Sequence, residues 1–229
     1  MKIGIIGAMA EEILLLQETL QDVATIDVLG RNYFTGQYLQ HEIIFVESGI
    51  GKVMSAVTTT ILVEKFGAEL IINTGSAGGI GAGLQVGDVV IAEKLAYFDA
   101  DVTGFGYAYG QMPGQPLYYE TAQNILQKAQ IAAKAVGQNV RSGLIVTGDS
   151  FVDHPEKITV IQKHFPEALA CEMEGAAIAQ AASSLHVPHL VIRAISDTAD
   201  HEATVSFDEF IITAGKKSAT MVLTLLGEL

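Results

Sequence analysis

The sequence predicts an α/β fold. Apolar runs of strand length alternate through most of the chain with stretches whose apolar residues recur at helical spacing. The strand-like runs repeatedly stop at a cluster of Gly, Ser and acidic residues. In open α/β sheets, ligands bind just beyond the carboxyl ends of the strands. We therefore expect these clusters to meet in one carboxylate-rich pocket.

Spacing and turn residues predict the elements of the first half. Ile13, Leu16 and Leu20 fall on one face of a helix that follows a buried strand. Three β-branched and aromatic segments separated by turn residues indicate a meander, and Gly67 is suited to end a helix. The expected order is strand Lys2–Gly7, helix Glu11–Leu20, strands Thr25–Leu29, Asn32–Tyr38 and Glu42–Val46, helix Lys52–Phe66, and strands Leu70–Asn73 and Asp88–Ala92 joined by a Gly-rich loop.

The second half opens with a loop and then returns to alternating elements. Residues from about Asp99 to Tyr119 are rich in Gly, Pro and aromatic side chains, and such a loop is either functional or packed by its own aromatics. His154-Pro155 fits a proline in the first turn of a helix. The expected helices are Thr121–Ala135, Glu156–His164, Glu174–Leu185 and Asp208–Leu226, with apolar strands at Leu144–Val146, Leu169–Cys171 and Leu190–Ile192.

Composition argues against several classes of partner. The 229 residues carry a formal net charge of −13, which repels nucleic-acid phosphates and anionic membrane surfaces. An apolar fraction of 49% with 17% charged residues fits a single folded domain over residues 1–229. We find no signal-peptide pattern and no apolar stretch near the ~20 residues that cross a bilayer. With Cys171 as the single cysteine, we expect a cytoplasmic protein.

Motifs for other chemistries are weak. Gly49-Ile50-Gly51-Lys52 lacks the earlier Gly and the following Ser/Thr of a P-loop, and the glycines at 75–81 do not form a dinucleotide fingerprint. These glycines serve either close approach to a ligand or tight turns. The six His are scattered without metal-ligand spacing, so we expect neither a metal nor a cofactor. Cys171 lies in an apolar strand, as a buried inert thiol would.

Acidic residues near strand ends carry the chemical signal. Glu12 falls in the first helical turn after the first strand, and Asp197 directly follows a strand. Glu172 and Glu174 flank a strand-to-helix junction. Each alone fits an acid that interacts with a helix dipole. At equivalent ends of strands in one sheet they indicate function, because burying several carboxylates together is costly. Cleavage of a glycosidic bond requires an acid for the leaving group and a base for water.

Long motifs of unusual composition run nearly from end to end of the chain. They are Met1–Met9, Ser48–Val53, Ile71–Gly79, Asp99–Thr103, Glu172–Glu174, Arg193–Asp197 and Ser206–Phe210. On these motifs the chain closely resembles the bacterial 5′-methylthioadenosine/S-adenosylhomocysteine nucleosidases of the nucleoside phosphorylase superfamily. The resemblance implies a three-layer α/β/α fold with a mixed, partly barrel-like central sheet, and a homodimer. It also implies hydrolysis of 5′-methylthioadenosine, S-adenosylhomocysteine and 5′-deoxyadenosine to release adenine, serving methionine salvage and the recycling of S-adenosylmethionine by-products.

The resemblance also implies roles for single residues. Asp197 matches the acid that protonates adenine N7, and Glu12 matches the base that activates water. We expect burial and neighbouring carboxylates to raise the pKa of Asp197. The other residues placed at the substrate are Glu174 on the ribose 2′ and 3′ hydroxyls, Met173 against the sugar, Ser76, Glu172 and Arg193 near the water and ribose, Phe151 stacked on adenine with Val152 at its edge, Ser196 supporting Asp197, and Met9, Ile50 and Phe207 around the 5′-alkylthio group. The loop that completes the partner subunit's pocket contains Val102, Phe105, Tyr107 and Pro113.

Three other functions fit parts of the sequence. A nucleoside phosphorylase shares the fold but needs several cations for phosphate, and Arg193 is the single arginine expected at a strand end. A nucleosidase for futalosine or a related nucleoside would differ at the 5′ subsite. A nucleoside-binding sensor without catalysis would keep the pocket, but it has no need of both Glu12 and Asp197.

Overall fold

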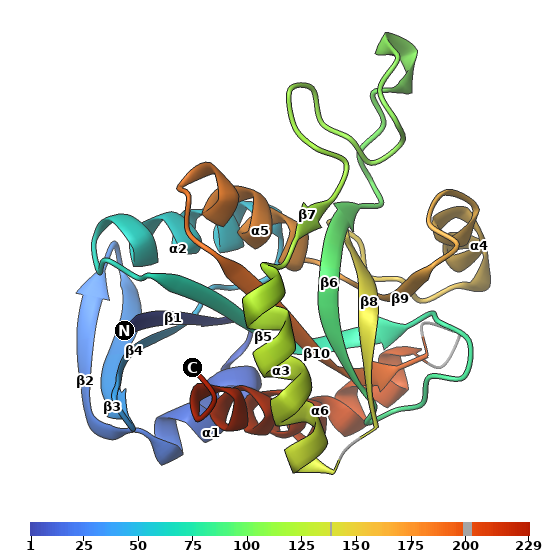
Figure 1. Ribbon diagram of the computed structural model, residues 1–229. Coiled ribbons are helices and arrows are strands. Elements are labelled where there is room, and N and C mark those ends of the chain that lie inside the picture. The colour runs from blue at the N-terminus through green and yellow to red at the C-terminus, as the bar shows by residue number, and fades with distance from the viewer. Residues whose placement is uncertain (138, 199–202) are drawn as a thin grey trace.

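Helices pack on both faces of a mixed central sheet in the computed structural model, which describes residues 1–137, 139–198 and 203–229 (Figure 1). The three-layer α/β architecture expected from the resemblance is confirmed. The strands are β1 Lys2–Gly7, β2 Gln21–Val28, β3 Arg31–Tyr38, β4 His41–Glu47, β5 Leu70–Gly79, β6 Val89–Tyr97, β7 Tyr119–Glu120, β8 Val140–Thr147, β9 Ala168–Glu172 and β10 His189–Asp197. The helices are α1 Ala10–Thr19, α2 Lys52–Glu64, α3 Gln123–Val136, α4 Pro155–His164, α5 Gly175–Ser184 and α6 Ala203–Leu226, with a short 3₁₀ turn at Thr103–Phe105.

Part of the sheet closes into a barrel. The strands pair in the order β10-β6-β8-β9-β5-β1-β4-β3-β2, and β10 also pairs with β5, so β10, β6, β8, β9 and β5 form a closed ring. β5 runs parallel to β1 and β10 but antiparallel to β9. Because this one hydrogen-bonded sheet joins strands from both ends of the sequence, we propose that residues 1–229 form a single domain.

Alternating side chains of the strands pack into separate apolar clusters on the two faces of the sheet. Ile3 and Ile5 of β1 pack in a cluster with apolar residues of α1, α3 and α6. Ile6 and Ile44 pack in another cluster, to which α2 contributes Leu62 and α5 contributes its own apolar residues. Successive side chains of a strand point to opposite faces, so each buried strand supports a helix layer on both sides. This packing fixes the helices whose ends carry the acidic residues.

The long strand β5 changes partners halfway along one of its edges. From Leu70 to Asn73 that edge pairs with β1, and at Gly78 and Gly79 it pairs with β9. Over the intervening residues 74–77, no strand in the described part of the chain pairs with this edge. β10 continues along the other edge as far as Gly78. The sheet is therefore split open between β1 and β9.

Several predicted boundaries were wrong. The segment after Asn73, predicted as a Gly-rich loop, continues as strand to Gly79, because β10 pairs along it. Asp197 is the last residue of β10 and does not follow the strand. The last helix begins at Ala203, five residues before the expected Asp208. β9 runs antiparallel to β5, so the acidic residues are not at equivalent ends of parallel strands.

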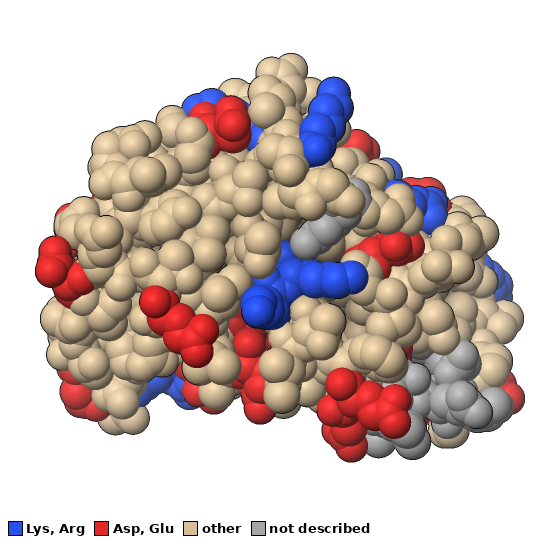
Figure 2. All heavy atoms as spheres, turned by 90° about the horizontal axis from the view of Figure 1, so that it is seen from below, with Lys and Arg blue, Asp and Glu red and all other residues tan. Residues whose placement is uncertain are grey.

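The aromatic loop between β6 and β7 and the charged side chains shape the surface of the protein. The segment between β6 and β7 projects from the body at the top of Figure 1, with Phe105 85% exposed. On the face shown in Figure 2, Lys and Arg side chains form small separate groups among acidic and uncharged residues. Within the described ranges, no helix has both the length and the apolarity needed to cross a membrane.

Candidate active site

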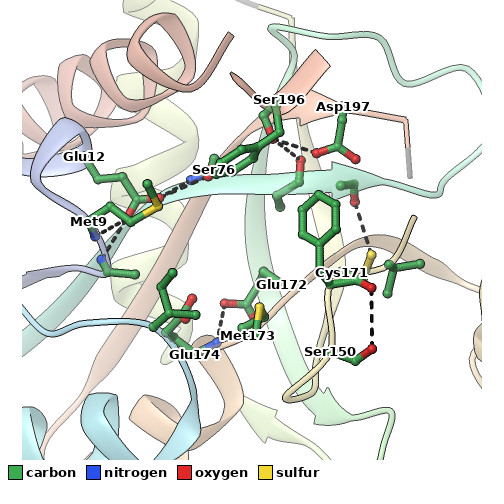
Figure 3. A pocket seen from close by; sticks show the side chains of 17 residues that line it. Met9, Glu12, Ser76, Ser150, Cys171, Glu172, Met173, Glu174, Ser196 and Asp197 are labelled. Atoms are coloured by element: carbon green, nitrogen blue, oxygen red, sulfur yellow. Dashed lines mark hydrogen bonds between the residues drawn. The ribbon is translucent and has the colours of Figure 1, made fainter. Parts of the chain in front are cut away.

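The split in the sheet opens into a cavity of about 470 Å³ (Figure 3). Four acidic residues and several apolar side chains line it, drawn from β5, β9 and β10, from α1 and α6, and from the loops after β1, β4, β8 and β9. The described lining residues are Ala8, Met9, Glu12, Ile50, Ser76, Ala77, Gly78, Ser150, Phe151, Val152, Cys171, Glu172, Met173, Glu174, Ser196, Asp197 and Phe207. Glu12 and Asp197 lie at different ends of this cavity.

Glu12 is buried, and four donors hold its carboxylate. Its Oε2 accepts the backbone N–H of Ala8 at 2.7 Å and that of Met9 at 3.3 Å. Its Oε1 accepts both the N–H and the hydroxyl of Ser76, at 2.9 and 3.1 Å. Gly75 permits this approach, because a Cβ there would lie 2.6 Å from Oε1. The carboxylate thus takes the place of a strand beside the open edge of β5.

Glu174 lies against the N-terminus of α2. Its Oε1 accepts the N–H of Gly51 at 2.8 Å, and Gly51 adopts φ +98°, a conformation that favours glycine. Burial, and then the negative charge of Glu172, raise the pKa of Glu174 to about 8, although Arg193 and the Gly51 bond act in the opposite direction. The carboxyl of Glu174 therefore holds its proton more tightly than an ordinary glutamic acid does.

Glu172 and Arg193 form a buried ion pair behind Glu174. Glu172 Oε2 accepts from Arg193 at 2.5 Å and from the N–H groups of Glu174 and Gly175 at 3.0 and 2.8 Å. Its Oε1 accepts a hydrogen bond from the hydroxyl of Thr147, and this hydroxyl in turn accepts the N–H of Ala176. These bonds cap the start of α5 and fix the backbone of Glu174. Burial would lower the pKa of Arg193, but the surrounding carboxylates raise it, so it stays a cation.

A bulge at the end of β10 sets the other end of the cavity. The register of β10 against β5 shifts between Ile195 and Asp197, and such bulges re-aim side chains. The hydroxyl of Ser196 donates to Asp197 Oδ2 at 2.9 Å, and both residues are buried. Phe151 and Phe207 line the same cavity, and their rings contact each other edge to face with 5.8 Å between centroids. An acid and aromatic side chains in one cavity suit a protonatable heteroaromatic ring.

The structure brings together most of the predicted site. Every predicted substrate residue lines the cavity except Arg193, which is 1% exposed and reaches the site only through Glu172 and Glu174. The four predicted residues of the aromatic loop, Val102, Phe105, Tyr107 and Pro113, do not line this chain's own cavity.

Sequence reasoning missed part of the lining and its support. Ala8, Ala77 and Gly78 are lining residues that flank recognised motifs, and their small size gave no chemical signal. Cys171, expected to be an inert strand thiol, also lines the cavity, and burial raises its pKa. Thr147, which supports Glu172, was missed because a threonine at the end of a strand is common. Among the described residues, no group of three or more His, Cys, Asp or Glu could hold a metal ion.

The raised pKa of Glu174 predicts how stability depends on pH. The folded state binds a proton between the ordinary pKa of 4.5 and about 8 that the unfolded state releases, so stability falls as pH rises through this window. Glu174→Gln stays neutral and keeps an oxygen for the Gly51 N–H. We expect it to gain on the order of a few kcal/mol relative to wild type between pH 5 and pH 8. Urea unfolding of both proteins at each pH measures this, and parallel profiles would contradict it.

Comparisons with known proteins agree with this geometry. The model of the phosphorylase superfamily matches residues 2–227. A 5′-methylthioadenosine/S-adenosylhomocysteine nucleosidase of Listeria monocytogenes serovar 1/2a is 49% identical, over 99% of each chain. The S-adenosylhomocysteine nucleosidase of Streptococcus pyogenes, solved with 5-methylthiotubericidin, is 53% identical with a TM-score of 0.98, over 100% of this chain and 97% of that one. The nucleosidase of S. pneumoniae, solved with the transition-state inhibitor MT-ImmA, is 56% identical with a TM-score of 0.96, over 99% and 98%. The chain belongs to the phosphorylase superfamily and, within it, to the 5′-methylthioadenosine/S-adenosylhomocysteine nucleosidases.

Proposed function

We propose that this protein hydrolyses the N-glycosidic bond of 5′-methylthioadenosine and S-adenosylhomocysteine, releasing adenine and the 5-substituted ribose. 5′-Deoxyadenosine, which shares the adenine and ribose, is proposed as a further substrate. Water adds its hydroxyl to C1′ while the C1′–N9 bond breaks and its electron pair stays with adenine. One carboxyl group gives a proton to adenine N7, and another takes the proton of the water. The observation that carries this proposal is the placement of two buried acids, Glu12 and Asp197, at different ends of one cavity.

Asp197 is proposed as the acid. It lines the same cavity as Phe151, whose ring is proposed to stack on adenine, and Ser196 donates to one of its oxygens. Proton transfer from a positioned acid contributes about 10²–10⁴-fold in rate.

Glu12 is proposed as the base. A carboxylate has about four acceptor sites, and four protein donors occupy them here. Three of these donors are backbone amides, which are fixed. The fourth is the Ser76 hydroxyl, which can rotate, so it is the donor that yields its place to the water. Ser76 therefore helps to place the water and also, through its backbone N–H, holds the Glu12 carboxylate.

Glu174 is proposed to hold the ribose. Its carboxyl lies between the start of α2 and the lining residue Met173, within the same cavity as both proposed catalytic groups. Two vicinal hydroxyls donating to one carboxylate favour its ionised form, so a bound ribose would oppose the raised pKa of Glu174. This contact would place C1′ between the water at Glu12 and the adenine beside Asp197.

Phosphorolysis is disfavoured by charge. Among the described lining residues none is Lys or Arg, and Arg193 is already paired with Glu172 behind the wall. A phosphate dianion would have to lie beside several carboxylates.

We therefore expect purified protein to release adenine from 5′-methylthioadenosine in phosphate-free buffer, with no increase in rate when phosphate is added. Strict dependence on phosphate would reverse the assignment. Futalosine and 5′-deoxyadenosine tested in parallel identify the 5′ group accepted, and tight nucleoside binding without adenine release would indicate a sensor.

The roles of the acid and the base predict distinct variants. We expect Asp197→Asn and Glu12→Gln each to lose at least about 10²-fold in kcat, because neither amide can transfer the required proton. Both amides keep the size of the side chain, so the affinity for adenine, measured by calorimetry, should change little. Leu29→Ala, at an 88% exposed turn, is the matched control. Turnover near wild type in either amide variant would remove that residue from its role.

We further propose that the protein is a cytoplasmic homodimer. Val53, Met54 and Val57 leave 72%, 37% and 44% of their surface exposed on α2, which is unusual for neighbouring apolar side chains. A second hollow of about 340 Å³ adjoins them, between α2 and α5. The ion pair of Lys52 with Asp99, 2.7 Å, ties the start of the aromatic loop to this surface. A second copy placed here would bring its own loop towards the cavity mouth, where Ile50 is exposed.

A charge on this surface tests the dimer. Val53→Glu should give a particle near 24.3 kDa in light scattering, whereas wild type should have about twice that mass. Turnover of 5′-methylthioadenosine should fall with the dimer, because the partner's loop no longer completes the pocket. Leu29→Glu places the same charge on an exposed turn and should change neither property. A wild-type protein that is monomeric and fully active would refute this proposal.

A further inference from the structure

We propose that one turn of α6, through Gly215 and Ser218, positions Glu12 for its reaction. Neither residue lines the cavity. Three residues apart on a helix, they share a face, and that face contacts both chain segments on which the Glu12 carboxylate depends. This inference rests on the proposed role of Glu12 as the base.

Ser218 uses the full hydrogen-bonding capacity of its hydroxyl inside the sheet. It is 0% exposed, and its Oγ donates to the carbonyl of Ile192 on β10 at 3.2 Å. The same oxygen accepts the N–H of Gly75 at 3.1 Å and lies 2.7 Å from the hydroxyl of Thr74, both on β5. A hydroxyl has one donor and two acceptor sites, so all three are filled when Thr74 donates. Ser218 thereby fastens β5 to β10 beside the stretch whose other edge is open.

The segment held by Ser218 is the one that holds Glu12. Directly after Gly75, the N–H and hydroxyl of Ser76 donate to Glu12 Oε1. On the open edge no strand of the described chain keeps residues 74–77 in place. A loosened Gly75 would move the Ser76 donors, and geometric errors of about 1 Å at a catalytic group can cost about 10²-fold in rate.

Gly215 packs against the backbone that carries the Glu12 side chain. A Cβ at this position would lie 2.6 Å from the backbone oxygen of Glu11 and 3.2 Å from Glu12 Cα. The missing side chain lets α6 pack directly on the first turn of α1. α6 therefore contacts the backbone that carries Glu12 and the strand that supplies its hydroxyl donor.

The test compares variants that remove a buried hydroxyl at two places. Ser218→Ala removes all three bonds, and Ser218→Cys keeps the volume with a weaker donor and acceptor. Ser55→Ala is the matched control, because Ser55 is also 0% exposed on a helix and bonds the carbonyl of Lys52 at 3.0 Å. For 5′-methylthioadenosine we expect kcat about tenfold lower in Ser218→Ala, equal to ~1.4 kcal/mol, with KM within about twofold and an intermediate kcat for Ser218→Cys. Adenine affinity should stay unchanged, and Ser55→Ala should keep the wild-type kcat.

Amide hydrogen exchange gives a readout that does not depend on turnover. The N–H groups of Gly75 and Ser76 should exchange faster in Ser218→Ala than in wild type, and at the wild-type rate in Ser55→Ala. Unchanged exchange at Ser76, or a kcat loss that Ser55→Ala reproduces, would overturn the inference. If wild-type protein releases no adenine, the proposed function fails, while the exchange rates still decide whether Ser218 holds β5.

Discussion

The site depends on one interruption in the pairing of β5. Buried backbone N–H groups require a partner, and between Asn73 and Gly78 one edge of β5 lacks a strand in the described chain. The carboxylate of Glu12 fills the place by accepting the N–H of Ser76. The departure of β1 from this edge, and the arrival of β9 further along, leave room for a ligand at the same point. The gap that needs a carboxylate is thus also the gap that admits substrate.

Three of the four buried acids, Glu12, Glu172 and Glu174, differ in how their charge is balanced. Glu12 is held by three amides and a hydroxyl, and Glu172 by two amides, a hydroxyl and Arg193. Glu174 has the Gly51 N–H and an arginine 3.8 Å away that is already committed to Glu172. Burial, and then the charge of Glu172, raise the pKa of Glu174 more than these two groups lower it. A carboxyl that gains donors when a diol binds suits a ribose-binding group, whereas a carboxylate fixed by three amides, with a rotatable hydroxyl at its fourth site, suits a positioned base.

The sequence predicted the fold class, most elements and most of the cavity residues, but not the way in which the strands bring them together. Glu172 and Asp197 meet because the barrel closes, not because parallel strands end at one edge, and barrel closure leaves no local pattern. The extension of β5 was missed because its glycines resemble a loop. Arg193 looked like a ligand contact, since a motif shows that a residue matters but not whether it lies in front of the wall or behind it. Ser218 could not be found, because a serine in an amphipathic helix carries no signal.

The fold alone does not decide between water and phosphate as the nucleophile, because functions change within a fold by changing the site. Here the decision depends on the place where a nucleophile must reach C1′. Glu12 occupies the wall at that place, fixed by amides of the turn between β1 and α1 and of β5, so a negative charge is part of the backbone arrangement. Admitting phosphate would require more than one substituted side chain. The Ser76 N–H would need another partner, and the edge of β5 would have to be closed or supplied with a cation. The preference for water is therefore built into the sheet.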